Sequence, residues 1–177
     1  MSNKRVVMVV DMQQRVFATP RLQREACVAR INQLTRAADR VIFIQHIEEG
    51  GLEEGSDGFA LLPDLYQPEG ALYSSKTACD AFYKTGLEQL LDEHGIREFV
   101  MCGCATDYCV DTTLKNAASK GYAITVAEDA HTTADRPAAQ AATLIAHYNE
   151  VWRTLTVPGN PVRVKPTETI LQAWQAN

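Results

Sequence analysis

The chain has 177 residues, of which 22% are charged, and a net charge of −5 at pH 7. This acidic balance disfavours nucleic acid and anionic membranes as partners, because both bind clustered Lys and Arg, and it favours a small-molecule partner. No apolar run reaches the roughly 18 residues that a membrane helix needs, and Asp11 interrupts the short apolar run near the N-terminus, so we expect no cleavable signal and a cytoplasmic location.

The first part of the chain alternates between predicted strands and a predicted helix. Residues 5–10 (RVVMVV) form a continuous apolar run, which is typical of a strand buried on both faces of a parallel sheet. Residues 21–38 carry an apolar stripe at helical spacing, and residues 40–45 (RVIFIQ) predict a second strand. A strand, a helix and a strand in this order favour parallel pairing through a right-handed crossover.

Polar residues follow both of these strands. Asp11 stands just beyond the first, at the edge of an open α/β sheet where ligands bind, although taken alone it fits a turn carboxylate or a helix cap at least as well. His46 follows the second and could be a ligand or a base, but no second histidine stands at metal spacing, so we favour a structural role. The loop at residues 46–70 is rich in Gly, Glu, Asp and Pro and is a candidate for the rim of a site.

The rest of the chain continues the alternation. Further strands are predicted at residues 71–75, 96–103, 122–127 and 151–157, and further helices at residues 84–94 and 137–149. Lys76 ends the third strand and is an ordinary surface residue unless the fold brings it to Asp11. The tail at residues 158–177 has one short predicted helix, whose apolar side chains would pack against a neighbouring subunit or against their own domain: Ile170, Leu171 and Trp174. We therefore predict one domain over residues 1–177, of the α/β class, with a mostly parallel six-stranded sheet.

Residues 100–122 (VMCGCATDYCVDTTLKNAASKGY) join the fourth strand to a helix and carry the strongest candidate for chemistry. Thr106 is the expected N-cap of this helix and Gly121 its expected end. Cys109 would lie in the first turn, where unpaired backbone N–H groups favour the thiolate and so make the sulfur nucleophilic. The alternative is a buried cysteine that only fills space.

The remaining cysteines and motifs argue against metals and cofactors. Five cysteines make an odd count without the spacing of a secreted disulfide framework, so reduced thiols are expected. Cys102, Cys104 and Cys109 lack the spacing of C-x-x-C zinc knuckles. The glycine-rich motifs G-x-G-x-x-G and G-x-x-x-x-G-K-[ST] are absent, as is G-x-S-x-G, so we expect no nucleotide cofactor and no serine hydrolase of the α/β-hydrolase kind.

Three sequence stretches together resemble one family. VVDMQ around Asp11, KTACDAFYKTGL from Lys76 and GCATDYCVDTT around Cys109 are similar to the isochorismatase-like cysteine hydrolases. The resemblance runs from about residue 6 to residue 155, and G-x-A-T-D-x-C-V is its most specific part. It implies a three-layer α/β/α sandwich with a Rossmann-like sheet and a hydrolase that cleaves the C–N bond of a small amide or carbamoyl compound.

The resemblance also implies roles for particular residues. Cys109 would be the nucleophile, Asp11 the general base and Lys76 the cation of a triad, and the bond between Cys104 and Ala105 would be a cis peptide. The backbone N–H groups of Ala105 and Cys109 would form the oxyanion hole, and the carbon–sulfur intermediate would be a thioester. Phe17 and Tyr108 are candidates to line the substrate pocket, with plain packing as the alternative.

Departures from the family narrow the substrate class. The D-x-H metal motif of nicotinamidases is replaced here by Gln45-His46-Ile47, which disfavours a metal-dependent nicotinamidase, and Cys109 disfavours the vinyl-ether chemistry of isochorismatase itself. Asp80 stands where many members have Ser, and the sequence does not predict how this residue changes the polarisation of the substrate pocket. The family suggests a homodimer or larger homo-oligomer. Two alternatives to catalysis remain: a thiol redox or sensing protein that uses Cys109 with Cys104 or Cys102, and a catalytically idle oligomeric binding protein.

Overall fold

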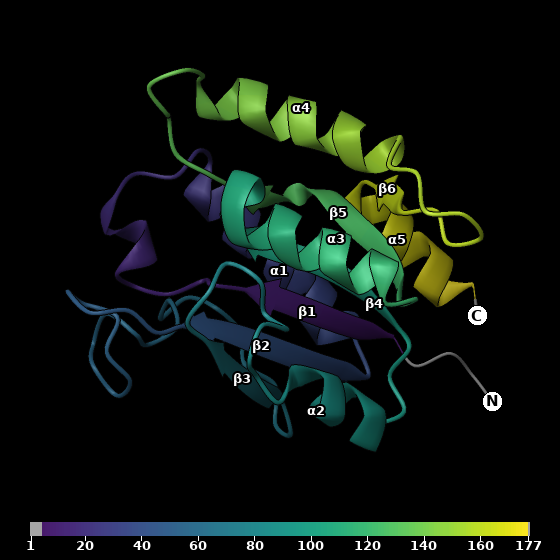
Figure 1. The fold of residues 1–177 in the computed structure, drawn as a ribbon, viewed down its shortest axis with the longest axis horizontal. Coiled ribbons are helices and arrows are strands. Elements are labelled where there is room, and N and C mark those ends of the chain that lie inside the picture. The colour runs from purple at the N-terminus through teal and green to yellow at the C-terminus, as the bar shows by residue number, and fades with distance from the viewer. Residues whose placement is uncertain (1–4, 177) are drawn as a thin grey trace.

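A parallel β-sheet runs through the middle of the computed structural model, which describes residues 5–176 (Figure 1). Within those residues the sheet has six strands in the order β3-β2-β1-β4-β5-β6, and every neighbouring pair is parallel. The strands are β1 (Val6–Val10), β2 (Arg40–His46), β3 (Leu72–Lys76), β4 (Glu98–Cys104), β5 (Ala123–Thr132) and β6 (Arg163–Lys165). The predicted α/β class and parallel sheet are confirmed.

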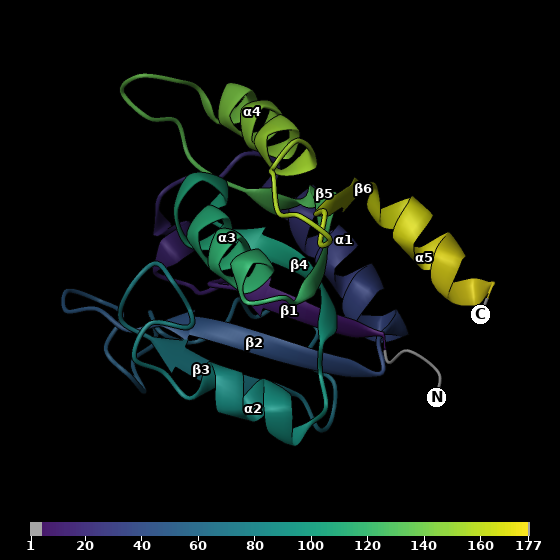
Figure 2. The ribbon, with the colours of Figure 1, turned by 45° about the vertical axis from the view of Figure 1, so that its right-hand side comes forward.

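Helices cover both faces of this sheet and make three layers (Figures 1 and 2). One face carries α2 (Leu87–Glu93), α3 (Asp111–Ser119) and α4 (Ala141–Arg153), and the other carries α1 (Arg24–Ala37) and α5 (Thr167–Gln175). The alternation of side chains along a strand explains why β1 is apolar throughout: Val6, Met8 and Val10 join the core under α2 and α3, and Val7 and Val9 join the core under α1.

The predicted strand at residues 151–157 is wrong. Helix α4 continues to Arg153, and the sixth strand is the short segment Arg163–Lys165. The apolar run misleads because Trp152 belongs to a helical face: its indole is fully buried, it donates a hydrogen bond to Asp111 Oδ1 at 2.8 Å, and its ring packs against Tyr148 one turn earlier. The tertiary environment of Trp152 therefore decides a segment whose β-branched residues favour a strand.

The C-terminal tail packs on its own domain. Ile170 is buried, and Leu171 and Trp174 pack against the same core as α1. Asp129 on β5 accepts hydrogen bonds from the backbone N–H and the hydroxyl of Thr167, at 2.9 and 2.6 Å, which fixes the start of α5. Of the two alternatives for the apolar tail, the structure therefore shows the intramolecular one.

A glycine allows β1 and β4 to approach closely at the edge where both strands end. Gly103 has a φ of +120°, and a Cβ built on it would lie 2.2 Å from the carbonyl oxygen of Val10 and 2.6 Å from the nitrogen of Val10. Both are backbone atoms, which cannot move aside for a Cβ as a flexible side chain could, so only glycine fits at this position. The close approach brings the segment after β4 next to Asp11, the residue that follows Val10.

Candidate active site

Three side chains that are far apart in the sequence meet at the carboxyl edge of the sheet. Asp11 follows β1, Lys76 is the last residue of β3, and Cys109 lies in a π-helical turn, Thr106–Val110, between β4 and α3. The ammonium nitrogen of Lys76 lies 2.9 Å from Asp11 Oδ2 and 3.3 Å from Cys109 Sγ. The sequence predicted these three residues, and the structure brings them together.

The three side chains are largely buried. Asp11 and Lys76 are only 2% and 1% exposed, and Cys109 is partly buried. Burial by itself lowers the pKa of Lys76, but the charge of Asp11, the sulfur of Cys109 and the hydrogen bonds that the ammonium donates to them outweigh burial and raise this pKa. The lysine is therefore a fixed positive charge between the carboxylate and the sulfur.

Asp11 has one occupied and one free carboxylate oxygen. Its backbone lies in the left-handed region, with φ at 49°, and its N–H donates to the carbonyl of Ile44 at 3.0 Å. Oδ2 accepts from Lys76, whereas Oδ1 is buried and has no hydrogen-bond partner among residues 5–176. A buried acceptor without a donor is costly in a resting protein, and it is available to a proton that arrives during a reaction.

The expectation that Cys109 favours the thiolate is wrong for the structure without a substrate. Burial raises the pKa of the Cys109 thiol, the negative charge of Asp11 raises it further, and the charge of Lys76 lowers it only in part. Desolvation of the charged form therefore exceeds the stabilisation by the lysine. These surroundings favour the thiol form, which needs a base before the sulfur can attack.

The start of the helix also differs from the prediction. Ala105, and not Thr106, is the N-cap, and no side chain caps it. The carbonyl oxygen of Ala105 instead accepts from the N–H groups of Tyr108 and Val110, each at 3.1 Å, and the bond between Cys104 and Ala105 is cis. Ala105 and Cys109 thus lie on one tight turn, where their assignment to an oxyanion hole stays a prediction.

Residues that sequence reasoning missed hold this turn from behind. The hydroxyl of Thr106 lies 2.7 Å from Nδ1 of His131 on β5. Asp107 accepts from Arg136 Nε at 2.9 Å and from the hydroxyl of Thr133 at 2.6 Å. Burial alone would raise the pKa of Asp107, but these hydrogen bonds lower it. The residues come from β5 and the segment after it, so only the folded arrangement reveals the contacts.

The loop after Lys76 is fastened to the helix that follows Cys109. Thr113 on α3 accepts from the N–H of Ala81 at 3.0 Å and donates to the carbonyl of Cys79 at 3.2 Å. Asp80 accepts from Asn116 on α3 at 2.5 Å and from the N–H of Phe82 at 2.9 Å. Asp80, whose effect was left open above, is thus bound to α3 and to its own loop.

The two predicted pocket-lining residues differ in exposure. Phe17, in a short 3₁₀ turn at Val16–Ala18, is partly buried against the core under α1, with the guanidinium of Arg24 5.8 Å from its ring centre. Tyr108 is 51% exposed, and the guanidinium of Arg136 lies 4.6 Å from its ring centre. Their role in substrate binding stays a prediction, for which the chain position of Tyr108 beside Cys109 is the stronger support.

His46 lies closer to the site than its predicted structural role required. Its Nδ1 is 2.8 Å from the ammonium nitrogen of Lys76. The register of the sheet explains this contact, since His46 and Lys76 are paired residues on β2 and β3. Sequence alone does not give that register, although the position of both residues at strand ends could have suggested it.

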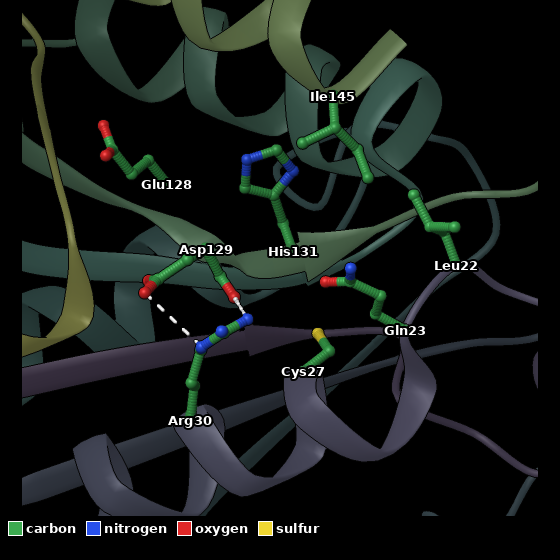
Figure 3. A pocket seen from close by; sticks show the side chains of 8 residues that line it. All are labelled: Leu22, Gln23, Cys27, Arg30, Glu128, Asp129, His131 and Ile145. Carbon is green, nitrogen blue, oxygen red and sulfur yellow. Dashed lines mark hydrogen bonds and ion pairs between the residues drawn. The ribbon is translucent and has the colours of Figure 1, made fainter. Parts of the chain in front are cut away.

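A separate cavity of about 270 Å³ lies between α1, β5 and α4 (Figure 3). In Figure 3, His131 extends from β5 towards α4, and Cys27 and Arg30 come from α1 on the other side. Arg30 is held by Asp129, with 3.0 Å to its carbonyl and 3.4 Å to Oδ2. The residues that line the cavity are Leu22, Gln23, Cys27, Arg30, Glu128, Asp129, His131 and Ile145. Asp11, Lys76 and Cys109 do not line this cavity.

None of the helices within residues 5–176 combines the length and the apolar composition that crossing a lipid bilayer requires. Within the same residues, no three His, Cys, Asp or Glu side chains are grouped as a metal site would need.

Comparisons with known proteins agree on one family. The model of the isochorismatase domain matches residues 5–155. A crystal structure of a hydrolase of the isochorismatase family from Chromobacterium violaceum has a TM-score of 0.82 and 28% identity, and the match covers 99% of this chain and 96% of that one. An isochorismatase family protein of Bacillus subtilis, YddQ, is 25% identical over 138 residues, which is 72% of this chain and 77% of that protein.

A shorter match concerns a protein with a named activity. The ureidoacrylate amidohydrolase RutB of Methylorubrum extorquens is 35% identical over 89 residues, which is 50% of this chain and 36% of that protein. Several curated relatives are matched over only 23% to 60% of their own length.

Proposed function

The chain belongs to the isochorismatase family of hydrolases, and we propose that it cleaves a C–N bond of a small amide or carbamoyl compound, with Cys109 as the nucleophile of a thioester intermediate. The single observation that carries this proposal is the arrangement around Lys76. One ammonium contacts both Asp11 and Cys109 in a nearly dry site, and the second oxygen of Asp11 is left without a partner. A thiol, a fixed cation and an available base are what acyl transfer by a cysteine requires.

The first half of the proposed reaction forms the thioester. Asp11 Oδ1 takes the thiol proton of Cys109 while the sulfur attacks the carbonyl carbon of the substrate. The negative charge that develops on the carbonyl oxygen is stabilised by the backbone N–H groups of Ala105 and Cys109. Asp11 then returns the proton to the leaving nitrogen, the C–N bond breaks, and ammonia or an amine departs.

The second half regenerates the enzyme. Asp11 accepts a proton from a water molecule, whose oxygen attacks the thioester carbonyl, and the carbon–sulfur bond breaks. The proton returns to the sulfur, and the product leaves as a carboxylic or carbamic acid. Lys76 stays protonated in both halves, because its raised pKa keeps it charged beside Asp11.

The relatives support the C–N bond as the target. RutB is described as an ureidoacrylate amidohydrolase, and a relative from Streptomyces noursei as a streptothricin hydrolase. These relatives support the class of bond and not a particular substrate, because the match to the streptothricin hydrolase covers 23% of that protein.

The structure disfavours the redox alternative. Cys102 and Cys104 are both fully buried, and burial raises the pKa of Cys102 and brings that of Cys104 to about 12. Neither sulfur is a ready partner for a disulfide with Cys109, because thiol exchange needs an accessible thiolate.

An ammonia-release assay over a panel of small primary amides and carbamoyl compounds tests the proposal. For any substrate that is turned over, Cys109→Ala should lower the turnover rate on the order of 10⁴-fold or more, as expected when a nucleophile is removed. Cys27→Ala, a cysteine change outside the triad, is the matched control and should keep the rate within a few-fold. Turnover that survives in Cys109→Ala, or a panel that yields no substrate for the wild type, counts against the proposal.

A further inference from the structure

Lys76 has more hydrogen-bond acceptors around it than it has hydrogens. Four acceptors surround its ammonium nitrogen: His46 Nδ1 at 2.8 Å, Asp11 Oδ2 at 2.9 Å, the carbonyl of Ala78 at 3.0 Å and Cys109 Sγ at 3.3 Å. A lysine ammonium carries three N–H donors. One acceptor must go without a full hydrogen bond, and the sulfur is both the most distant and the weakest acceptor of the four.

The sheet topology puts His46 in this competition. Lys76 ends β3, Asp11 follows β1, and β2 lies between those strands. The lysine side chain therefore crosses the end of β2 to reach the carboxylate, and the residue at that end is His46, its register partner. The amide of the fully buried Gln13 holds the backbone of His46, with 2.8 Å to its N–H and 3.0 Å to its carbonyl.

The protonation state of His46 follows from its neighbours. Burial lowers the pKa of His46, the charge of Lys76 lowers it further, and the charges of Asp11 and Glu48 oppose these effects only in part. An ammonium only donates, so Nδ1 must be the acceptor and the ring hydrogen lies on Nε2, which is 4.0 Å from a carboxylate oxygen of Glu48. The lone pair on Nδ1 is thus committed to Lys76.

We propose that His46 is a positioning residue that takes one hydrogen of Lys76 and so withholds it from the sulfur of Cys109. The inference builds on the proposed role of Cys109 as nucleophile. Because the shorter contacts of the ammonium are with His46, Asp11 and Ala78, its hydrogen bond to the sulfur is the weakest of the four, and the sulfur keeps its own proton until that proton moves to Asp11 Oδ1. The resting enzyme then holds a protected thiol, and the base and the cation stay aligned for the attack.

Alkylation of Cys109 by iodoacetamide measures this effect without any substrate. The rate of modification is followed by peptide mass spectrometry from about pH 6 to about pH 10, because only the thiolate reacts. The charged and titratable groups that act on this thiol are Asp11, Lys76 and Cys79, and those that face His46 are Lys76, Asp11 and Glu48. Each of them is kept in the two decisive variants.

The decisive comparison is between His46→Leu, which has no acceptor, and His46→Asn, whose Oδ1 can stand where Nδ1 stood. In His46→Leu the released hydrogen turns to the sulfur, and alkylation near neutral pH should become about 3- to 10-fold faster, which is half to one unit in the midpoint of the pH profile. His46→Asn should restore the wild-type profile. Glu48→Gln, which changes the charge near Nε2 and leaves Nδ1 in place, should stay within about twofold of the wild type.

Three results would overturn the proposal: equal rates in His46→Leu and the wild type, a slower rate in His46→Leu, or an equal acceleration in His46→Leu and His46→Asn. Modification of the fully buried Cys102 in the same digest reports a loosened fold, and His46→Phe then replaces His46→Leu in the comparison. A protein that hydrolyses no amide would still give these alkylation rates, so failure of the proposed function and failure of this inference are separate results.

Discussion

Asp11 and Lys76 form an ion pair that is almost completely removed from water. Their side chains are 4% and 0% exposed, and the charged atoms are 2.9 Å apart. The free energy of desolvating two such charges is recovered only through close contact and further hydrogen bonds, which Ala78 and His46 supply to the ammonium. Because the folded pKa of Lys76 is raised, the stability that it contributes is fully present at neutral pH and is lost only in strong alkali.

Removal of one partner from this pair should cost more free energy than removal of both. Lys76→Met leaves the Asp11 carboxylate buried and unpaired, and we expect a loss of about 3–5 kcal/mol in the free energy of unfolding. The double variant Asp11→Asn with Lys76→Met should recover most of that loss, as measured by urea denaturation. Arg5→Met, which breaks the exposed ion pair of Arg5 with Asp39, is the control and should leave the urea midpoint close to that of the wild type. If the double variant were as unstable as Lys76→Met alone, buried charge would not be the cause.

At this scale the sequence predicts which residues meet but not their protonation. Asp11, Lys76 and Cys109 stand near the carboxyl ends of predicted strands, which share one edge of a parallel sheet, but it is the resemblance to the isochorismatase-like hydrolases that groups them as a triad. The thiol state of Cys109 could not, because it depends on how much water the surrounding side chains exclude. His46 was assigned a structural role because its contact with Lys76 depends on the pairing register of two strands.

Among the elements, α3 and the loop after β3 behave as one unit. Thr113 is fully buried and uses both its donor and its acceptor on that loop, and the loop supplies the carbonyl of Ala78 to Lys76. Helix α3 follows the turn of Cys109 directly. The hydroxyl of Thr113 therefore joins the segment of the nucleophile to the segment of the cation.

Thr113→Val tests this connection. The substitution keeps the shape of the side chain but leaves the N–H of Ala81 and the carbonyl of Cys79 without their partner, and we expect a loss of about 2 kcal/mol. For a chain of this size the melting temperature should fall by about 5 °C. Thr112→Val, at the neighbouring exposed position, should change stability by less than about 0.5 kcal/mol. Equal melting temperatures for the two variants would contradict the role assigned to Thr113.

The elements themselves were predicted in order and mostly in type. Helix and strand periodicity placed α1, α2, β1, β2 and β4 within three residues of their observed bounds, because each has a buried face, whereas β5 continues to Thr132, beyond its predicted end at residue 127. The prediction failed where local preference and tertiary packing disagree. The end of α4 has the composition of a strand, and the start of α3 is a π-helical turn fixed by contacts of Thr106 and Asp107 with residues far along the chain.

Across the whole molecule, one buried histidine joins three parts of the fold. His131 on β5 lies 2.7 Å from the hydroxyl of Thr106 in the turn of Cys109 and 2.8 Å from Asn149 Oδ1 on α4. Burial lowers its pKa to about 4. With Nε2–H donating to Asn149 and Nδ1 accepting from Thr106, both ring nitrogens are satisfied in the neutral form that burial favours.

The molecule should therefore lose stability as the pH falls from about 6.5 to about 4. Between these pH values the unfolded chain binds a proton at His131 that the folded chain excludes. The free energy of unfolding therefore decreases as the pH decreases. The contribution of this one group is about 3 kcal/mol between pH 7 and pH 4. His131→Gln, which can still donate to Asn149, should flatten this part of the profile of chemical unfolding against pH. A slope as steep in His131→Gln as in the wild type would assign the acid sensitivity to other groups.

The amino-acid composition of the C-terminal tail does not decide what the tail packs against. Its apolar residues fit a subunit contact and an intramolecular contact equally well until α5 is seen to pack on the core under α1. The proposed homodimer or larger assembly therefore gains no support from the tail. Light scattering of the purified protein measures its oligomeric state directly.

The backbone contact at Gly103 has a consequence for how this protein can vary. Any residue larger than glycine there would push against Val10, and the chain leads from Val10 straight into Asp11. Both the folding of the chain and the position of Asp11 therefore depend on the absence of a Cβ at residue 103. A substitution there cannot improve stability at the expense of activity, or activity at the expense of stability. A library randomised at residue 103 should return glycine alone, whether it is selected for expression or for turnover.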